Sequence, residues 1–178
     1  MSDPLSTSEE VLDALWRAAQ DRGLLGGPVD FQYIRTPEGD LVGPLEFWRQ
    51  EHVRHFMGLR FEGLGGDEEG SDVVLCWYPG LTGARPVLSF GADNTIGLVA
   101  ASEAAFLRQL ASGFVWSGAE DAWIPSPEHG DYDWGALQTF VRDALGGVES
   151  DPNAAMAAAR DAHPDVAALI TTLLEPAK

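Results

Sequence analysis

Two histidines stand three residues apart in the segment His52-Val53-Arg54-His55, directly after Glu51. On a helix this spacing places both imidazoles on one face, where they and the carboxylate could ligate a metal ion. The HExxH spacing, which adds a general base, is absent, and no further histidine or cysteine stands nearby at ligand spacing. A metal-dependent hydrolase using His52 and His55 is one hypothesis. Exposed histidines between arginines are the alternative.

A second group of oxygen donors consists of Asp131 and Asp133 around Tyr132, preceded by Glu128 and His129. Carboxylates that converge in a loop could hold a divalent cation, although this stretch does not match the longer calcium-loop pattern. The sequence therefore leaves open whether Asp131 and Asp133 bind a cation.

Residue patterns typical of nucleophilic catalysis or phosphate binding are missing. Cys76 lies in the apolar run 73–78, which predicts a buried strand and a thiol with a raised pKa. There is no GxSxG elbow. The glycine-rich run 63–66 precedes acidic residues, which would repel a phosphate. We expect no catalytic residue, no cofactor and no enzymatic activity.

Acidic and aromatic residues gather in two segments, 67–72 and 114–134, and the second contains no lysine or arginine. Aromatic anchors with an acidic rim suit a basic protein surface, because aromatics supply rigid apolar area and charges orient the encounter. Alternatively, 67–72 is a solvated hairpin connection and the aromatics pin an irregular loop onto a sheet. The residues that we expect to contact a partner are Asp67, Glu68, Glu69, Asp72, Trp116, Glu120, Asp121 and Trp123.

The charge of the whole chain excludes some partners. Its 178 residues include 28 acidic and 11 basic side chains, a net charge of −17. Nucleic acid and anionic membranes are bound through clustered lysine and arginine, which this chain lacks. The charge either keeps the protein soluble or steers it towards a basic partner.

The length fits one domain, which we place over residues 1–178. One cysteine allows no intramolecular disulfide, and the run Met1-Ser2-Asp3-Pro4 does not resemble a signal peptide. No apolar run approaches the roughly 18 residues of a membrane span. We therefore expect a cytoplasmic protein.

Local patterns predict the elements that must position these residues. A capping box at Ser6 or Thr7 with Glu9 and Glu10 predicts a helix that ends near Gly23. Residues 31–34 and 41–42 are predicted to form a hairpin, and residues 44–57 a helix. Further strands are expected at 59–64, 73–78, 86–90 and 96–100.

The rest of the chain is predicted to be helical apart from one irregular segment. Ser102 is a good N-cap for a helix that closes at Gly113, and residues 114–134 are expected to be irregular. Helices follow over 134–145 and over 152–174, the latter interrupted at Pro164. These elements predict an α+β fold with a mainly antiparallel sheet, flanked by an N-terminal helix and C-terminal helices. The expected division is a core at about 5–113, an acidic and aromatic loop at 114–134 and a helical extension at 135–178.

One stretch resembles a known superfamily. It runs Arg85-Pro86-Val87-Leu88-Ser89-Phe90-Gly91-Ala92-Asp93-Asn94-Thr95-Ile96-Gly97-Leu98-Val99-Ala100-Ala101-Ser102 and continues through Phe106-Leu107-Arg108-Gln109-Leu110-Ala111-Ser112-Gly113. A strand ending in a glycine turn, a second strand and a short helix with an aromatic and leucines are similar to the late part of a SUKH domain. The likeness covers roughly residues 59–113. The superfamily groups fungal cell-wall assembly regulators, bacterial Syd-like proteins, herpesviral proteins and many bacterial immunity proteins.

The resemblance implies an antiparallel α+β fold and, in bacteria, frequent service as an immunity protein that neutralises a toxin, often a nuclease. Our leading hypothesis is therefore an immunity-type protein that binds a basic toxin domain stoichiometrically. A regulatory adaptor of the cell-wall-regulator kind, binding an endogenous partner, is the alternative. The sequence leaves the oligomeric state and the packing of the C-terminal helices open.

Overall fold

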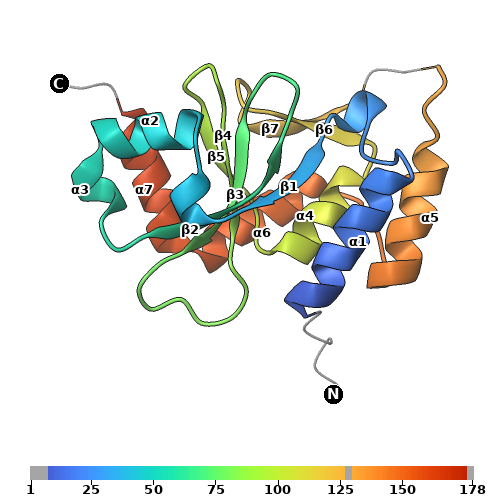
Figure 1. Ribbon diagram of the computed structural model, residues 1–178, viewed down its shortest axis with the longest axis horizontal. Coiled ribbons are helices and arrows are strands. Elements are labelled where there is room, and N and C mark those ends of the chain that lie inside the picture. Colours follow the sequence, from blue (N-terminus) through green and yellow to red (C-terminus); the bar gives the residue numbers. More distant parts are fainter. Residues whose placement is uncertain (1–7, 127–129, 176–178) are drawn as a thin grey trace.

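The computed structural model of the chain describes residues 8–126 and 130–175. Its centre is a five-stranded antiparallel sheet in which every strand pairs with the next one along the chain (Figure 1). The strands are β1 (Gln32–Thr36), β2 (Arg60–Gly66), β3 (Asp72–Trp77), β4 (Val87–Phe90) and β5 (Ile96–Ala100). The predicted α+β class with a mainly antiparallel sheet is confirmed.

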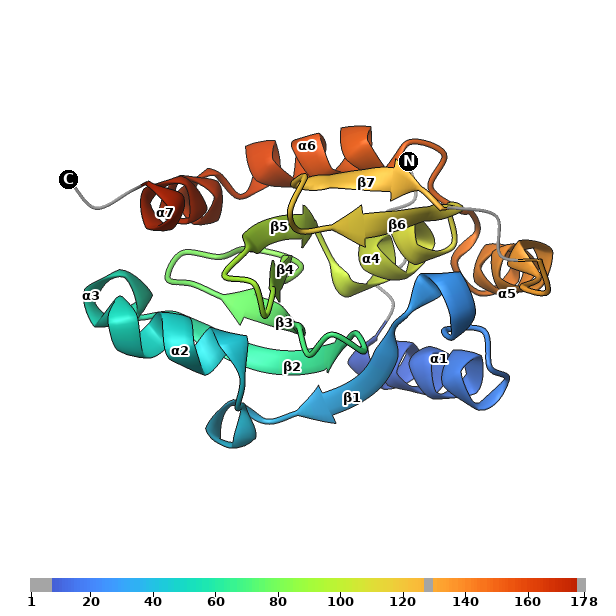
Figure 2. The ribbon, with the colours of Figure 1, turned by 90° about the horizontal axis from the view of Figure 1, so that it is seen from above.

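Helices cover both faces of this sheet (Figure 2). The face called here the α1 face is covered by α1 (Glu9–Asp21), α4 (Glu103–Leu110) and α5 (Trp134–Leu145). The opposite face is covered by α2 (Pro44–Glu51), α3 (Val53–Phe56) and α7 (Pro164–Leu174). Short 3-10 turns, η1 (Gly27–Val29) and η2 (Glu38–Asp40), flank β1. Across residues 8–126 and 130–175, no helix has the length and apolar character needed to cross a membrane.

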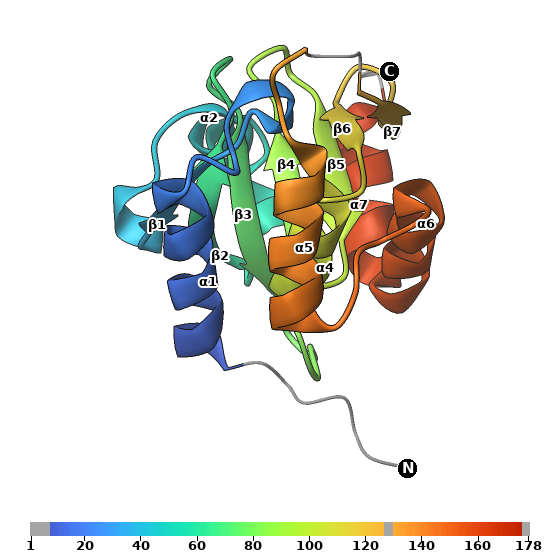
Figure 3. The same cartoon turned by 90° about the vertical axis from the view of Figure 1, so that its right-hand side faces the viewer.

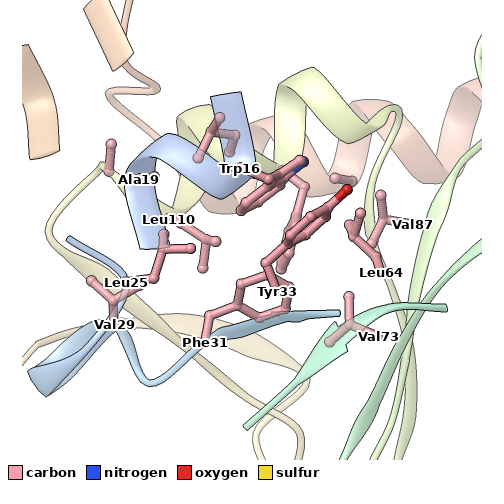
Figure 4. Packing of buried hydrophobic residues seen from close by; sticks show 14 of the residues in the cluster. Trp16, Ala19, Leu25, Val29, Phe31, Tyr33, Leu64, Val73, Val87 and Leu110 are labelled. Atoms are coloured by element: carbon pink, nitrogen blue, oxygen red, sulfur yellow. The ribbon is translucent and has the colours of Figure 1, made fainter. Parts of the chain in front are cut away.

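Alternating apolar residues divide the core into two clusters, one on each face. In β3, Val73 and Leu75 join the cluster on the α1 face, whereas Val74 and Cys76 join the opposite one, as the two-residue period of a strand requires. On the α1 face the ring of Trp16 stacks on that of Tyr33 at a centroid distance of 5.5 Å (Figure 4). The continuous apolar run that predicted this strand therefore supplies apolar side chains to both faces of the sheet, and helices cover each face.

The C-terminal helices pack on the sheet, a point that the sequence left open. Helix α6 (Pro152–Ala162) runs along the edge strand β5, and α5 lies beside α1 (Figure 3). Met156 of α6 belongs to the cluster on the α1 face and Ala159 to the opposite one. The helices predicted at 134–145 and 152–174, with their break at Pro164, are confirmed.

Residues 114–134 contain a second sheet, so the prediction that they are irregular is wrong. Strands β6 (Phe114–Ser117) and β7 (Ala122–Pro125) form an antiparallel hairpin in which Trp116 pairs with Trp123. Each strand has four residues and the pair is set apart from the main sheet. The β-prone residues at 114–116 and 123–124 were the available signal.

Other boundaries also differ from the prediction. The hairpin expected between 31–34 and 41–42 does not form, because β1 pairs with β2 and residues 41–42 are not in a strand. The helix expected over 44–57 breaks at His52, whose φ of −128° and ψ of 41° are not helical. The N-cap of α1 is Ser8, while Ser6 and Thr7 lie outside the described residues.

Candidate partner-binding site

A pocket of about 400 Å³ opens on the α1 face and is lined by the β2–β3 turn, η1 and β6. These three segments lie at the same end of the main sheet (Figure 1). The base of the pocket consists of buried apolar side chains, among them Val73, Val99, Phe106 and Leu110. Its polar lining residues are Asp30, Asp67, Glu68, Glu69 and Ser89, and Trp116 contributes an aromatic wall. We call this the acidic–aromatic pocket. It joins the two segments, 67–72 and 114–134, that the sequence singled out separately.

Hydrogen bonds to backbone amides hold the acidic turn in place. The Asp30 carboxylate accepts a hydrogen bond from the Glu68 backbone N–H at 3.2 Å, and that of Asp67 accepts one from the Ser71 N–H at 2.9 Å. Gly65, just before the turn, must be a glycine, because a Cβ there would lie 2.0 Å from the Gln32 carbonyl oxygen. Strand β2 can therefore approach β1 closely and deliver the turn to the pocket.

Glu68 and Glu69 differ from these two aspartates because their side chains are exposed. Neither carboxylate forms a hydrogen bond or an ion pair within residues 8–126 and 130–175. The residues that line the pocket include four acids and no lysine or arginine. Four like charges around one small volume repel one another, so a cation that entered would be attracted.

Trp116 is positioned by a glycine in the sheet beneath it. A Cβ on Gly97 would lie 2.7 Å from Cζ2 of Trp116, so the ring occupies the space over Gly97 that a side chain would fill. Gly97 pairs with Ser89 across β4 and β5, and Ser89 pairs with Val73 across β3 and β4. The indole ring therefore lies beside Ser89 on the α1 face.

Ser89 is a buried polar residue with an unused hydrogen-bonding group. It is 5% exposed, and its hydroxyl has no hydrogen-bond partner among the described residues. Its oxygen is not among the fully enclosed side-chain atoms that lack a partner, so the hydroxyl keeps accessible surface, and Ser89 lines the pocket. Its position inside the apolar run Val87-Leu88-Ser89-Phe90 is the sequence signal that we missed.

Two predicted contact residues instead support the fold. Asp72 accepts a hydrogen bond from the Leu45 backbone N–H at 2.9 Å and so caps α2, whose own N-cap, Gly43, has no side chain. Burial raises the pKa of the Asp72 carboxyl, against the opposing effect of this hydrogen bond. Trp123 is 1% exposed and packs against Phe106 at a centroid distance of 6.2 Å. Its expected role as a surface anchor is wrong, and it pins the hairpin onto the core.

The remaining two predicted residues lie in the β6–β7 connection. Glu120 is exposed. Asp121 is paired with Arg160 of α6 at 2.7 Å. Neither lines the acidic–aromatic pocket. Of the eight predicted residues, the pocket thus brings together Asp67, Glu68, Glu69 and Trp116, and it adds Asp30 and Ser89, which the sequence reasoning did not identify.

A buried ion pair supports the wall formed by α4. Arg35 donates to the Glu103 carboxylate at 2.8 Å, and the indole N–H of Trp16 donates to the same oxygen at 2.9 Å. Burial raises the pKa of Glu103, although the Arg35 guanidinium opposes that shift. These contacts tie α1, β1 and α4 together, and α4 carries Phe106 and Leu110 of the pocket.

The other chemical candidates gain no support. His52 stacks on Trp48 at 5.3 Å and its ring lies 6.0 Å from that of His55. Within residues 8–126 and 130–175, no three His, Cys, Asp or Glu side chains are grouped so that they could hold a metal ion. Asp133 caps α5 through the Ala136 N–H, and Glu128 and His129 lie outside the described residues. Burial raises the pKa of the Cys76 thiol to about 12.

Similarity to other proteins offers no guide to the function of this pocket. Comparison of the chain with known protein families, with curated proteins and with solved structures gives no match. The chemistry of the lining residues is therefore what indicates the occupant: apolar at the base, aromatic on one wall and anionic at the rim.

Proposed function

We propose that this chain is a binding protein that neutralises a basic protein partner by stoichiometric association, as a bacterial immunity protein neutralises its toxin. The observation that carries the proposal is the convergence of Asp67, Glu68, Glu69 and Trp116 in one pocket that no lysine or arginine lines. The likeness of residues 59–113 to SUKH domains, which include many immunity proteins, supports the same function.

Electrostatics connects this pocket to a basic partner. A nuclease must present lysine and arginine to the phosphates of its substrate, so an acidic inhibitor can cover that same surface. A net charge of −17 attracts such a partner over a long range. Net charge alone does not select a docking point. The pocket provides one, because it is concave, has an aromatic wall, and carries the carboxylates of Glu68 and Glu69, which have no partner within the described residues.

The test begins with capture of the partner from a native lysate on the purified chain. We expect a basic protein that is toxic when expressed alone and is neutralised at a ratio of one to one by this chain. The triple variant Asp67→Lys, Glu68→Lys and Glu69→Lys should fail to neutralise it. An endogenous partner without toxicity would instead favour the regulatory adaptor, and an enzymatic substrate in place of a protein partner would refute both.

A matched control separates the pocket from the overall charge. Glu51, Asp143 and Asp161 are exposed, and none of them has a hydrogen bond or ion pair within the described residues. Changing these three to lysine alters the net charge as much as the pocket variant does. We expect this control to neutralise the partner as the unmodified chain does. If both variants lost neutralising activity equally, a function for the pocket would be contradicted.

A further inference from the structure

We propose that the acidic–aromatic pocket takes up the side chain of an arginine of the partner, with its guanidinium held between Trp116, Ser89 and the acidic turn. This inference rests on the proposed function, because it names the group of the partner that the pocket recognises. The volume of about 400 Å³ is near the lower end of ligand pockets, which span roughly 300 to 1,000 Å³. It suits one inserted side chain better than an extended ligand.

The pocket has the two kinds of surface that an arginine needs. An arginine side chain combines an apolar stem with a charged head. Val29, Val73 and Val115 offer apolar surface to the stem, while the acidic turn offers Glu68 and Glu69, whose carboxylates have no partner within the described residues. A wholly apolar ligand would leave these charges unused, and a wholly polar cation would leave the apolar base without contacts.

Ser89 is the observation, independent of the acids, that points to a polar occupant. It is more than nine-tenths buried, lines the pocket and leaves its hydroxyl without a hydrogen bond in the part of the chain that the structure describes. The Ser89 oxygen is not one of the fully enclosed atoms without a partner, so it keeps accessible surface in the pocket that it lines and can bind an occupant. A guanidinium N–H can donate to this hydroxyl, which would then meet its hydrogen-bonding requirement.

Trp116 favours arginine over lysine. The guanidinium is planar, stacks on aromatic rings and carries five N–H donors in a fixed fork, whereas the lysine ammonium is a compact and strongly hydrated charge. The Trp116 ring stands beside Ser89 over Gly97, so a stacked guanidinium would reach the hydroxyl and the acidic turn at once. Stacking and bidentate pairing can therefore operate together only for arginine.

The test titrates the purified, isotope-labelled chain with N-acetyl-L-arginine amide and follows its NMR spectrum. We expect saturable shifts of the Trp116 indole N–H and of the backbone amides of Glu68 and Ser89. The lysine analogue should bind at least several-fold more weakly. The citrulline analogue, which has the same shape without the charge, should give no saturable shift. Shifts scattered over the acidic surface, or equal binding of the lysine analogue, would overturn the proposal.

Two conservative variants assign the binding to the pocket. Ser89→Ala should lower the affinity for the arginine analogue by roughly three- to ten-fold, which is the effect of one hydrogen bond. Glu68→Gln with Glu69→Gln should weaken it by at least about ten-fold, because the hydrogen bonds lost are charge-assisted. The control, Glu51→Gln with Asp161→Asn, should bind as the unmodified chain does. Both pocket variants change exposed or small side chains. Their folding is checked by NMR, since the amide signals of residues outside the pocket should not move.

Failure of this inference can be told apart from failure of the proposed function. If the arginine analogue does not bind and the captured partner is still neutralised through the acidic turn, the proposed function is supported and the arginine inference is refuted. If the analogue binds in the pocket and no basic partner is neutralised, the pocket is an arginine-binding site and the proposed function is refuted. Single arginines of the captured partner are then substituted one at a time. One of these substitutions should weaken the complex as much as Glu68→Gln with Glu69→Gln does.

Discussion

At the scale of single residues, the acidic side chains divide into those used by the fold and those left free. Glu103 is 5% exposed and is held by Arg35 and Trp16. Glu68 and Glu69 are exposed and have no partner within the described residues. Composition alone gives all of them the same weight. Only their contacts show which charges are available to bind another molecule.

Replacing Glu103 by glutamine should cost about 1 to 3 kcal/mol of the free energy of unfolding. The amide puts an NH2 group in place of one carboxylate oxygen, so one of the hydrogen bonds that Arg35 and Trp16 donate loses its acceptor. Chemical denaturation at pH 7 measures the change. Glu120→Gln, a change of the same kind on an exposed residue, is the control and should alter stability by less than about 0.5 kcal/mol.

The pH dependence of this difference has a definite sign. Burial raises the pKa of Glu103 in the folded chain above its ordinary value of 4.5. On acidification the folded state therefore takes up this proton first, and the unmodified chain gains stability relative to Glu103→Gln. The gap between the two chains should widen as the pH falls through the folded pKa towards 4.5. A gap that narrows would mean that the ion pair with Arg35 outweighs burial.

At the scale of elements, long-range contacts decide where helices begin and where the hairpin lies. The N-terminus of α2 is capped by Asp72, which is 27 residues away in the sequence. The β6–β7 hairpin is placed by Trp116 over Gly97 and by Trp123 in the core. The pocket exists because these two pieces, the β2–β3 turn and the hairpin, meet over the same end of the sheet.

Asp72→Ala should lower the free energy of unfolding by about 1 kcal/mol, because the Leu45 N–H loses its acceptor. Asp72→Asn keeps an acceptor oxygen and removes a half-buried charge, so its stability should stay within about 0.5 kcal/mol of the unmodified chain. Urea unfolding of the three proteins gives the comparison. If the two variants were equally unstable, the charge and not the hydrogen bond would matter at this position.

Gly97→Ala should destabilise the chain by about 1 to 3 kcal/mol, because its methyl group would stand 2.7 Å from Cζ2 of Trp116. The cost should shrink when Trp116 is replaced by alanine, which removes the ring that the methyl meets. A double-mutant cycle by urea unfolding measures this coupling. Additive costs would mean that the ring does not lie over Gly97.

The sequence could predict the elements whose signals are local and could not predict those set by distant contacts. The apolar run at 73–78, the apolar residues at 96–100 that follow a turn, and the N-cap Ser102 predicted two strands and a helix that the structure confirms. The paired strands at 114–117 and 122–125 are too short to show a period. For the site, the charges at 67–69 and Trp116 were identified, but their meeting with Asp30 and Ser89 depends on strand register and on Gly97, which no local pattern reveals.

At the scale of the whole molecule, two charge effects act together. The net charge of −17 attracts any basic protein at long range. The acidic–aromatic pocket concentrates four of the carboxylates at one end of the sheet, over an apolar base. In the proposed function, general attraction would make encounters frequent and the pocket would make one orientation productive. Salt screens the first effect over about 10 Å at 0.1 M and affects a desolvated contact much less.

The most direct test of this account is the association rate constant with the captured partner, measured by stopped flow as a function of ionic strength. The variant Asp67→Lys, Glu68→Lys and Glu69→Lys should associate at least about ten-fold more slowly at low salt and show a flatter salt dependence. The control with Glu51, Asp143 and Asp161 changed to lysine should retain most of the rate. Equal slowing by both variants would mean that only net charge acts, and would contradict the acidic–aromatic pocket as the docking site.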